Sequence, residues 1–198
     1  MGLELNYKNG QTPISEDEKE GLLFKAISTR GELDEFEQNN IEDAIAWTKK
    51  RKFKIEEILS EKFICDVHKK MFCDVWGWAG KFRKTDKNIG VDKFQIAVEL
   101  KYLFDDCRYW IRNKTYPEDE IAVRFKYRIV KIHPFPNGNG RHSRLCGDIL
   151  VSHGFDGKVF TWGKTNLTPQ SDTRKVYIDA VKAADQDNIK PLLEFARI

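Results

Sequence analysis

The segment from His133 to Arg144 gathers groups that could bind an anion and move a proton. Within twelve residues it contains two histidines, two glycines, two asparagines and two arginines. An imidazole, with an unperturbed pKa of about 6.5, suits a general base at neutral pH. Guanidinium groups can grip phosphate through two parallel hydrogen bonds. These residue types predict a phosphate-containing ligand with a base beside it.

The order of residues in this segment predicts how the groups are arranged. Two prolines after His133 end the preceding helix, because proline has no N–H and disfavours α geometry in the residue before it. Gly138 and Gly140 allow a tight turn, and a new helix begins there with unpaired N–H groups that attract anions. Arg141 and Arg144 are three residues apart, so they are neighbours on that helix.

The same residues allow two other interpretations. A glycine-rich turn before a helix is common, and a lone histidine is more often structural than catalytic. His133, His142, Cys146 and His153 could suggest zinc, but their spacing matches none of the usual ligand patterns. The density of functional groups around one helix start favours an anion-binding catalytic site.

The segment resembles the signature of the Fic (Fic/DOC) family, His-Pro-Phe-x-Asp/Glu-Gly-Asn-Gly-Arg-x-x-Arg, and departs from it at one fixed position. The resemblance continues on both sides of the signature. Residues 78–83 and 88–90 look like the family's approach to its flap hairpin, and residues 177–185 and 191–195 look like its C-terminal helices. Residues 29–33 and 37–41 look like a subfamily called mobile mystery protein B.

The resemblance implies an enzyme that transfers AMP from ATP to a Tyr, Thr or Ser hydroxyl of a target protein. It also assigns roles to residues of this chain. His133 would deprotonate the target hydroxyl, and Phe135 would anchor the loop in the core. A hairpin over residues 84–91 would align the target by strand addition, with an ordinary surface loop as the alternative for the same residues. The phosphates would be held by Gly138, Asn139, Gly140, Arg141 and Arg144.

The departure from the signature is Asn137, where the family has Asp or Glu to hold Mg²⁺ against the phosphates. Magnesium prefers charged oxygen ligands, so a neutral amide oxygen should bind it more weakly. This leaves two alternatives to AMP transfer open. The chain could be a nucleotide-binding regulator with little catalysis, or a transferase of another phosphate-containing group on the same fold.

A second motif concerns regulation. Many Fic proteins carry an inhibitory helix that reads Ser/Thr-x-x-x-Glu-Gly/Asn, whose glutamate pairs with the second arginine of the signature. Ser28 and Glu32 match this spacing, but Leu33 follows where Gly or Asn is expected. We therefore expect Glu32 either to pair with Arg144 as an inhibitor or simply to belong to the first turn of a helix capped by Ser28.

Helical periodicity dominates the chain, so the expected fold is all-α: a Fic-type helical bundle with a small β-hairpin flap. Residues 1–27 are expected to form an N-terminal extension and residues 28–198 the Fic domain, and Ser15 to Glu18 resembles a capping box. Helices are expected over residues 32–50, 55–76, 95–113, 117–130, 138–153 and 172–184, followed by a short one ending near residue 195.

Composition limits the class of protein. The chain has 198 residues, enough for one domain, with 40% hydrophobic and 33% charged residues. A net charge of only +3 does not predict direct binding of nucleic acid. No stretch is long enough for a membrane span, and the N-terminus has no secretory pattern, so we expect a cytoplasmic protein with reduced cysteines. The subfamily resemblance also implies a toxin–antitoxin-like role beside a helix-turn-helix protein encoded nearby.

Overall fold

The fold is a set of packed helices, as the periodicity predicts. The computed structural model describes residues 14–163 and 172–198. The elements in chain order are α1 (Glu16–Lys19), α2 (Arg30–Lys49), α3 (Ile55–Ile58), α4 (Glu61–Phe72), a 3-10 turn η1 (Lys93–Gln95), α5 (Ile96–Asn113), α6 (Glu118–Ile132), α7 (Asn139–Ile149), a π-helical turn η2 (Leu150–Gly154), α8 (Asp172–Ala184) and α9 (Lys190–Arg197).

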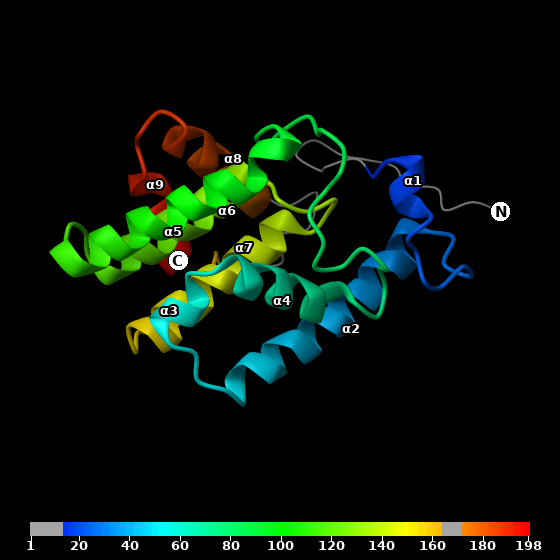
Figure 1. The fold of residues 1–198 in the computed structure, drawn as a ribbon, viewed down its shortest axis with the longest axis horizontal. Coiled ribbons are helices and arrows are strands. Elements are labelled where there is room, and N and C mark those ends of the chain that lie inside the picture. Colours follow the sequence, from blue (N-terminus) through cyan, green and yellow to red (C-terminus); the bar gives the residue numbers. More distant parts are fainter. Residues whose placement is uncertain (1–13, 164–171) are drawn as a thin grey trace.

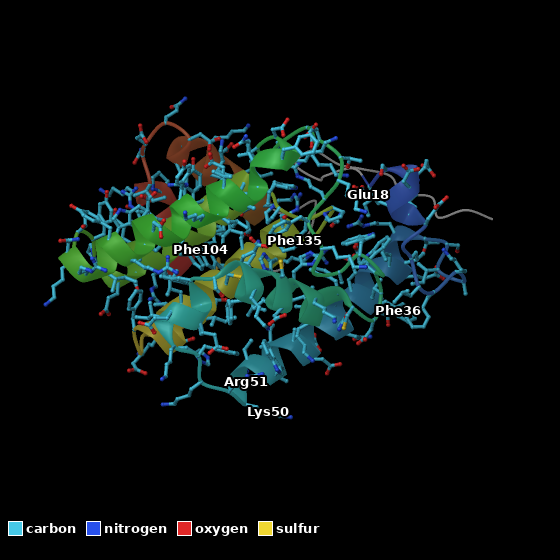
Figure 2. The ribbon with its side chains drawn as sticks, in the orientation of Figure 1. Glu18, Phe36, Lys50, Arg51, Phe104 and Phe135 are labelled. Atoms are coloured by element: carbon cyan, nitrogen blue, oxygen red, sulfur yellow. The ribbon has the colours of Figure 1, made fainter. Side chains whose placement is uncertain are left out.

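Helix α7 lies in the middle of the bundle, between α6 and α4 (Figure 1). Helix α2 packs on α4, α5 packs on α6, and α8 pairs with α9. The contact face of α6 follows from its sequence, since Ile121, Phe125, Ile129 and Ile132 recur at helical spacing and are all buried. The signature loop is anchored by Phe135, which is fully buried and lies near the centre of the molecule (Figure 2).

The prediction of one continuous helix over residues 55–76 is wrong. The structure divides it into α3 and α4 at Leu59 and Ser60. The Ser60 hydroxyl oxygen accepts a hydrogen bond from the Phe63 N–H at 3.2 Å, so Ser60 is the N-cap of α4. A serine side chain that bonds to the backbone in this way favours a helix start over a helix interior.

Of the two alternatives for residues 84–91, the hairpin is wrong and the loop is confirmed. This segment forms a loop without strand pairing, and in the described part of the chain an isolated antiparallel bridge joins Leu22 to Trp76 instead. The buried side chain of Arg83 explains the difference. Its guanidinium donates to the carbonyl oxygens of Thr85, at 2.9 Å, and Val91, so these carbonyls are bonded to a side chain instead of to an opposite strand.

The described part of the N-terminal extension packs on the rest of the chain; residues 1–13 of that extension lie outside the described residues. The capping box expected at Ser15 and Glu18 is confirmed. The Glu18 carboxylate also reaches the loop after α4, where it accepts from the Thr85 hydroxyl at 2.9 Å and pairs with the Lys87 ammonium at 2.5 Å. Helix α1 is thereby tied to residues 84–91.

None of the helices within residues 14–163 and 172–198 is both long enough and apolar enough to cross a membrane.

Candidate active site

His133 ends α6 in an unusual backbone conformation. Its φ is 55° and its ψ is 58°, which is left-handed and costs free energy for a residue with a side chain. Arg83 holds this turn from outside the helix. The Arg83 Nε donates to the His133 carbonyl at 2.7 Å, and the Arg83 backbone N–H donates to the Pro134 carbonyl at 2.9 Å. The base is therefore held by its backbone.

The His133 imidazole has a defined proton arrangement. Its Nδ1 lies 3.3 Å from the Val130 carbonyl oxygen, which can only accept, so Nδ1 carries the proton and Nε2 the lone pair. The pKa of His133 is lowered to about 4, mainly by burial; the hydrogen bond to Val130 raises it, and the positive charges of Arg83 and Lys87 also lower it. At neutral pH the ring is uncharged, which is the form a general base needs.

The turn between α6 and α7 is closed by Asn139. Its side-chain oxygen accepts from the Phe135 N–H at 2.9 Å, and its Nδ2 donates to the Phe135 carbonyl at 2.8 Å. The Asn139 side chain is thus used inside the loop, and what it can offer a ligand is its backbone N–H in the first turn of α7. The phosphate-binding role assigned to it stays a prediction about that N–H.

The two glycines of the turn serve different purposes. Gly138 has a φ of 78°, and a Cβ there would lie 2.5 Å from the Phe72 ring, so a side chain is excluded on both counts. A Cβ on Gly140 would meet no atom of the described residues within 4 Å. The first turn of α7 therefore has open space beside Gly140, where an anion could approach the backbone N–H groups.

His68 is a site residue that the sequence analysis missed. Its Nδ1 accepts from the Gly80 N–H at 2.9 Å, so its Nε2 carries the proton and donates to the Asn137 carbonyl at 3.1 Å. Its ring stacks on Phe135 with centroids 3.7 Å apart, and burial holds its pKa well below the usual value. A signal existed: with Ile64 and Met71 it forms an i, i+4, i+7 stripe on the buried face of α4.

Asn137 offers little to a metal ion. Its side-chain oxygen accepts from the Gly138 N–H at 2.6 Å and carries no charge. Across residues 14–163 and 172–198 no group of His, Cys, Asp or Glu side chains is arranged to hold a metal. Since Mg²⁺ is normally bound by one or two carboxylates plus phosphate, this donor set does not fit a magnesium site built by the protein.

The two arginines of the signature both lie on α7 but meet different neighbours. The Arg141 guanidinium forms an ion pair with the Glu37 carboxylate, Nη1 to Oε2 2.6 Å, and lies 5.0 Å from the Phe72 ring centroid. The Arg144 guanidinium lies 5.6 Å from the centroid of the Tyr177 ring in α8. The structure therefore brings both arginines to α7 but points them towards different elements.

The pairing expected between Glu32 and Arg144 is not formed. The Glu32 carboxylate accepts from the N–H groups of Ser28, at 3.0 Å, and Thr29, at 3.1 Å, and is exposed. Thr29 is the N-cap of α2 and completes a capping box with Glu32, so the capping alternative is confirmed, with Thr29 in place of Ser28. The Glu32 carboxylate is therefore bonded at the start of α2 and is not paired with Arg144.

Glu37, one turn further along α2, is the carboxylate that does reach the signature. It is 1% exposed, and its other oxygen accepts from the Trp76 indole N–H at 2.7 Å. The signal in the sequence was its position on the buried stripe of α2, with Leu33, Ile41 and Ala44. A buried glutamate on an apolar helix face needs a partner of opposite charge, which here is the half-buried Arg141.

The comparisons with known proteins agree with this geometry. The Fic/DOC family model matches residues 58–151. Over 143 residues the chain is 25% identical to protein adenylyltransferase Fic of Aedes aegypti, covering 70% of this chain and 27% of that protein. The chain thus spans about a quarter of the length of this relative.

Two solved structures share the fold. The N-terminal Fic domain of a putative cell filamentation protein from Bartonella quintana superimposes with a TM-score of 0.66 at 18% identity, covering 95% of this chain and 87% of that one. The BepC protein of Bartonella tribocorum, solved with bound AMPPNP, gives a TM-score of 0.65 at 17% identity, covering 91% and 96%. Residues 58–151 of this chain thus match the Fic/DOC family, and the described chain shares the fold of these Fic structures.

Proposed function

We propose that this chain transfers AMP from ATP to a hydroxyl group of a target protein. The observation that carries the proposal is the neutral His133, with its lone pair on Nε2, at the turn that leads into the N-terminus of α7. The first N–H groups of α7, beside the open space at Gly140, supply donors for a phosphate chain. The adenylyltransferase relative supports ATP as the donor.

The proposed reaction is a nucleophilic substitution at the α-phosphorus of ATP. The target hydroxyl gives its proton to Nε2 of His133 as its oxygen attacks the α-phosphorus of ATP. The bond from the α-phosphorus to the oxygen that bridges to the β-phosphate breaks, and pyrophosphate leaves with that electron pair. Arg141 and Arg144 hold the phosphates in this scheme, through charge-assisted hydrogen bonds.

Access to both the base and the arginines is restricted in this structure. A Cβ on Gly90 would lie 2.7 Å from the His133 Cβ, so the loop of residues 84–91 packs against the base. The Glu37 carboxylate already forms an ion pair with the Arg141 guanidinium. We propose that the incoming nucleotide displaces Glu37 and that this carboxylate, in place of Glu32, restrains the site. Residues 84–91 would then bind the target segment, for which strand addition is one mode.

Three finer assignments stay predictions: the mobile mystery protein B-like subfamily, the toxin-like role beside a helix-turn-helix protein, and the cytoplasmic location. A Mg²⁺ requirement also stays a prediction, and the neutral side chain of Asn137 argues against it.

Labelled ATP tests the proposed function directly. The chain is incubated with a cell extract and ATP carrying the label on either the α- or the γ-phosphate. Label transferred to protein from the α-position alone supports AMP transfer, whereas label from the γ-position means phosphorylation. Binding of ATP with no labelled protein would replace the proposal with the regulator, which the neutral side chain of Asn137 favours.

A further inference from the structure

A lysine lies fully buried behind the arginine that points to α8. Lys126 is 0% exposed, although lysines are almost never buried without a partner. Its ammonium donates to the Tyr177 hydroxyl oxygen at 2.6 Å and lies 4.4 Å from the centroid of the same ring. Its stem passes beside α7, since a Cβ on Gly147 would lie 3.2 Å from the Lys126 Cβ.

Tyr177 connects this lysine to the signature. The Arg144 guanidinium lies 5.6 Å from the Tyr177 ring centroid, within the range of a cation–π contact. One ring therefore contacts two cations, Lys126 through its hydroxyl and face, and Arg144 through its face. A different orientation of the ring would change its contact with Arg144.

Positive charge exceeds negative charge around this ring. Burial and the nearby charge of Arg144 lower the pKa of Lys126. Burial alone would raise the pKa of Tyr177, but the charges of Lys126 and Arg144 outweigh it, so the pKa is lowered. The acid that faces Arg144 on its own helix is Asp148, whose pKa burial raises to about 7. An anion bound at Arg144 would relieve the excess.

We propose that Lys126 is a positioning residue for nucleotide binding: its ammonium fixes Tyr177, and the Tyr177 ring fixes Arg144 where a phosphate chain meets it. The inference rests on the proposed function for the identity of the ligand, ATP. It does not depend on the transfer step. A lysine that merely filled the core would contribute to stability and leave Tyr177 and ATP binding unchanged.

Tyrosine absorbance tests the first contact without any activity. Lys126→Met keeps an unbranched side chain and removes the charge, and replacing a buried charge by a similar apolar group is well tolerated. Subtracting the 295 nm titration of Tyr177→Phe from that of the unaltered chain isolates Tyr177. We expect Tyr177 to ionise below its ordinary pKa in the unaltered chain, and at higher pH in Lys126→Met.

Calorimetry with ATP tests the second contact. We expect Lys126→Met to raise the Kd for ATP about tenfold, the scale of one hydrogen bond to a charged group. Tyr177→Phe should weaken binding similarly, and the double variant should be no weaker than either, because the two residues act in series. Lys131→Met is the matched control, since Lys131 lies on the same helix with its ammonium paired to Asp185, and its Kd should not change.

Two results would overturn the inference. One is a lower melting temperature of Lys126→Met with an unchanged Tyr177 titration and an unchanged Kd, which is the behaviour of a filler. The other is additive weakening in the double variant, which would mean that Lys126 does not act through Tyr177. If the unaltered chain binds no ATP, the proposed function and the nucleotide part of the inference both fail, while the titration still decides whether Lys126 holds Tyr177.

Discussion

Arg141 and Arg144 lie three residues apart on α7, yet their surroundings carry opposite charge. Arg141 meets the Glu37 carboxylate from α2, whereas Arg144 meets the Tyr177 ring and lies close to the positive charge of Lys126. An anion that arrives at Arg141 must compete with a buried carboxylate. An anion that arrives at Arg144 reduces an excess of positive charge.

This difference separates two properties of one site. The α2 side can hold the site closed, because Glu37 is buried and has a second partner in Trp76 that keeps it in place. The α8 side can hold the site ready, because Tyr177 and Lys126 orient Arg144 before a ligand arrives. Substitutions on the two sides should therefore change activity in opposite directions, which is a direct way to test the comparison.

The largest effect should come from His133, the general base for attack on the nucleotide that both arginines would hold. His133→Ala should reduce transfer of the α-label at least about 100-fold, the usual scale of a lost general base, while ATP binding stays nearly intact. The measurement is labelling rate together with calorimetric ATP affinity. His153→Ala is the control, because His153 lies in the turn after α7 and packs on Phe53. Equal labelling by the two variants would remove His133 from the mechanism.

The substitution Glu37→Gln removes the ion pair between α2 and Arg141 with the least change in shape. The amide can still accept from the Trp76 indole, but the charge that pairs with Arg141 is gone. We expect the labelling rate to rise about tenfold or more, since a hydrogen bond or ion contact to a charged group contributes about 1.5–3 kcal/mol. Activity is measured at ATP concentrations below saturation, where competition for Arg141 matters most.

Glu32→Gln is the matched control on the same helix. Its carboxylate serves the capping box, so this variant should lower the melting temperature slightly and leave the labelling rate unchanged. The double variant Glu37→Gln with Arg141→Ala should lose the gain, because the two residues act as a unit. A faster Glu32→Gln and an unchanged Glu37→Gln would reverse the assignment of the restraint.

Much of this could be predicted from local patterns. The helix over residues 30–49, the break after His133 and the start of α7 at Asn139 follow from periodicity, prolines and glycines. The family signature identified the segment around His133. The capping role of Glu32 also follows from its local sequence, although the capping residue is Thr29.

The remaining features depend on contacts between distant parts of the chain. Arg83 bonds to His133 across 50 positions, and His68 bonds to Asn137 across 69. The periodicity of a sequence does not predict which distant backbone carbonyl will accept a hydrogen bond from a buried side chain. The hairpin prediction failed for this reason, because residues 84–91 were judged by their own propensities while Arg83 took their carbonyls.

Asn137 tests the turn that precedes α7 and its two arginines. Asn137→Asp should tighten Mg²⁺-dependent ATP binding several-fold, because a charged oxygen replaces a neutral one. The Asp side chain can still accept from the Gly138 N–H, so the turn should keep its shape. Calorimetry with and without Mg²⁺ measures the effect. An affinity that ignores Mg²⁺ in both forms would show that this position has no metal role.

The smallest effect, and the last test, is a pH dependence that should be nearly absent. An exposed histidine with a pKa of about 6.5 loses about tenfold of its neutral form between pH 7.5 and pH 5.5. His133 has a pKa of about 4, because burial disfavours its charged form, so its neutral fraction should hardly change in that range. Since kcat/KM reports the base of the free chain, it should fall less than about twofold.

Two other effects must be separated from the titration of His133: the titration of Asp148 and a change in the stability of the chain. Asp148, with a pKa raised to about 7, titrates in the same range beside Arg144, so the profile is repeated with Asp148→Asn. Stability also changes: a histidine whose pKa is lowered in the folded chain stabilises it above about pH 6.5, and this is lost as the pH falls towards 4. Circular dichroism at each pH confirms that the chain is folded. A tenfold loss at pH 5.5 in folded Asp148→Asn would mean that His133 is exposed to solvent when it acts, and that residues 84–91 open before catalysis.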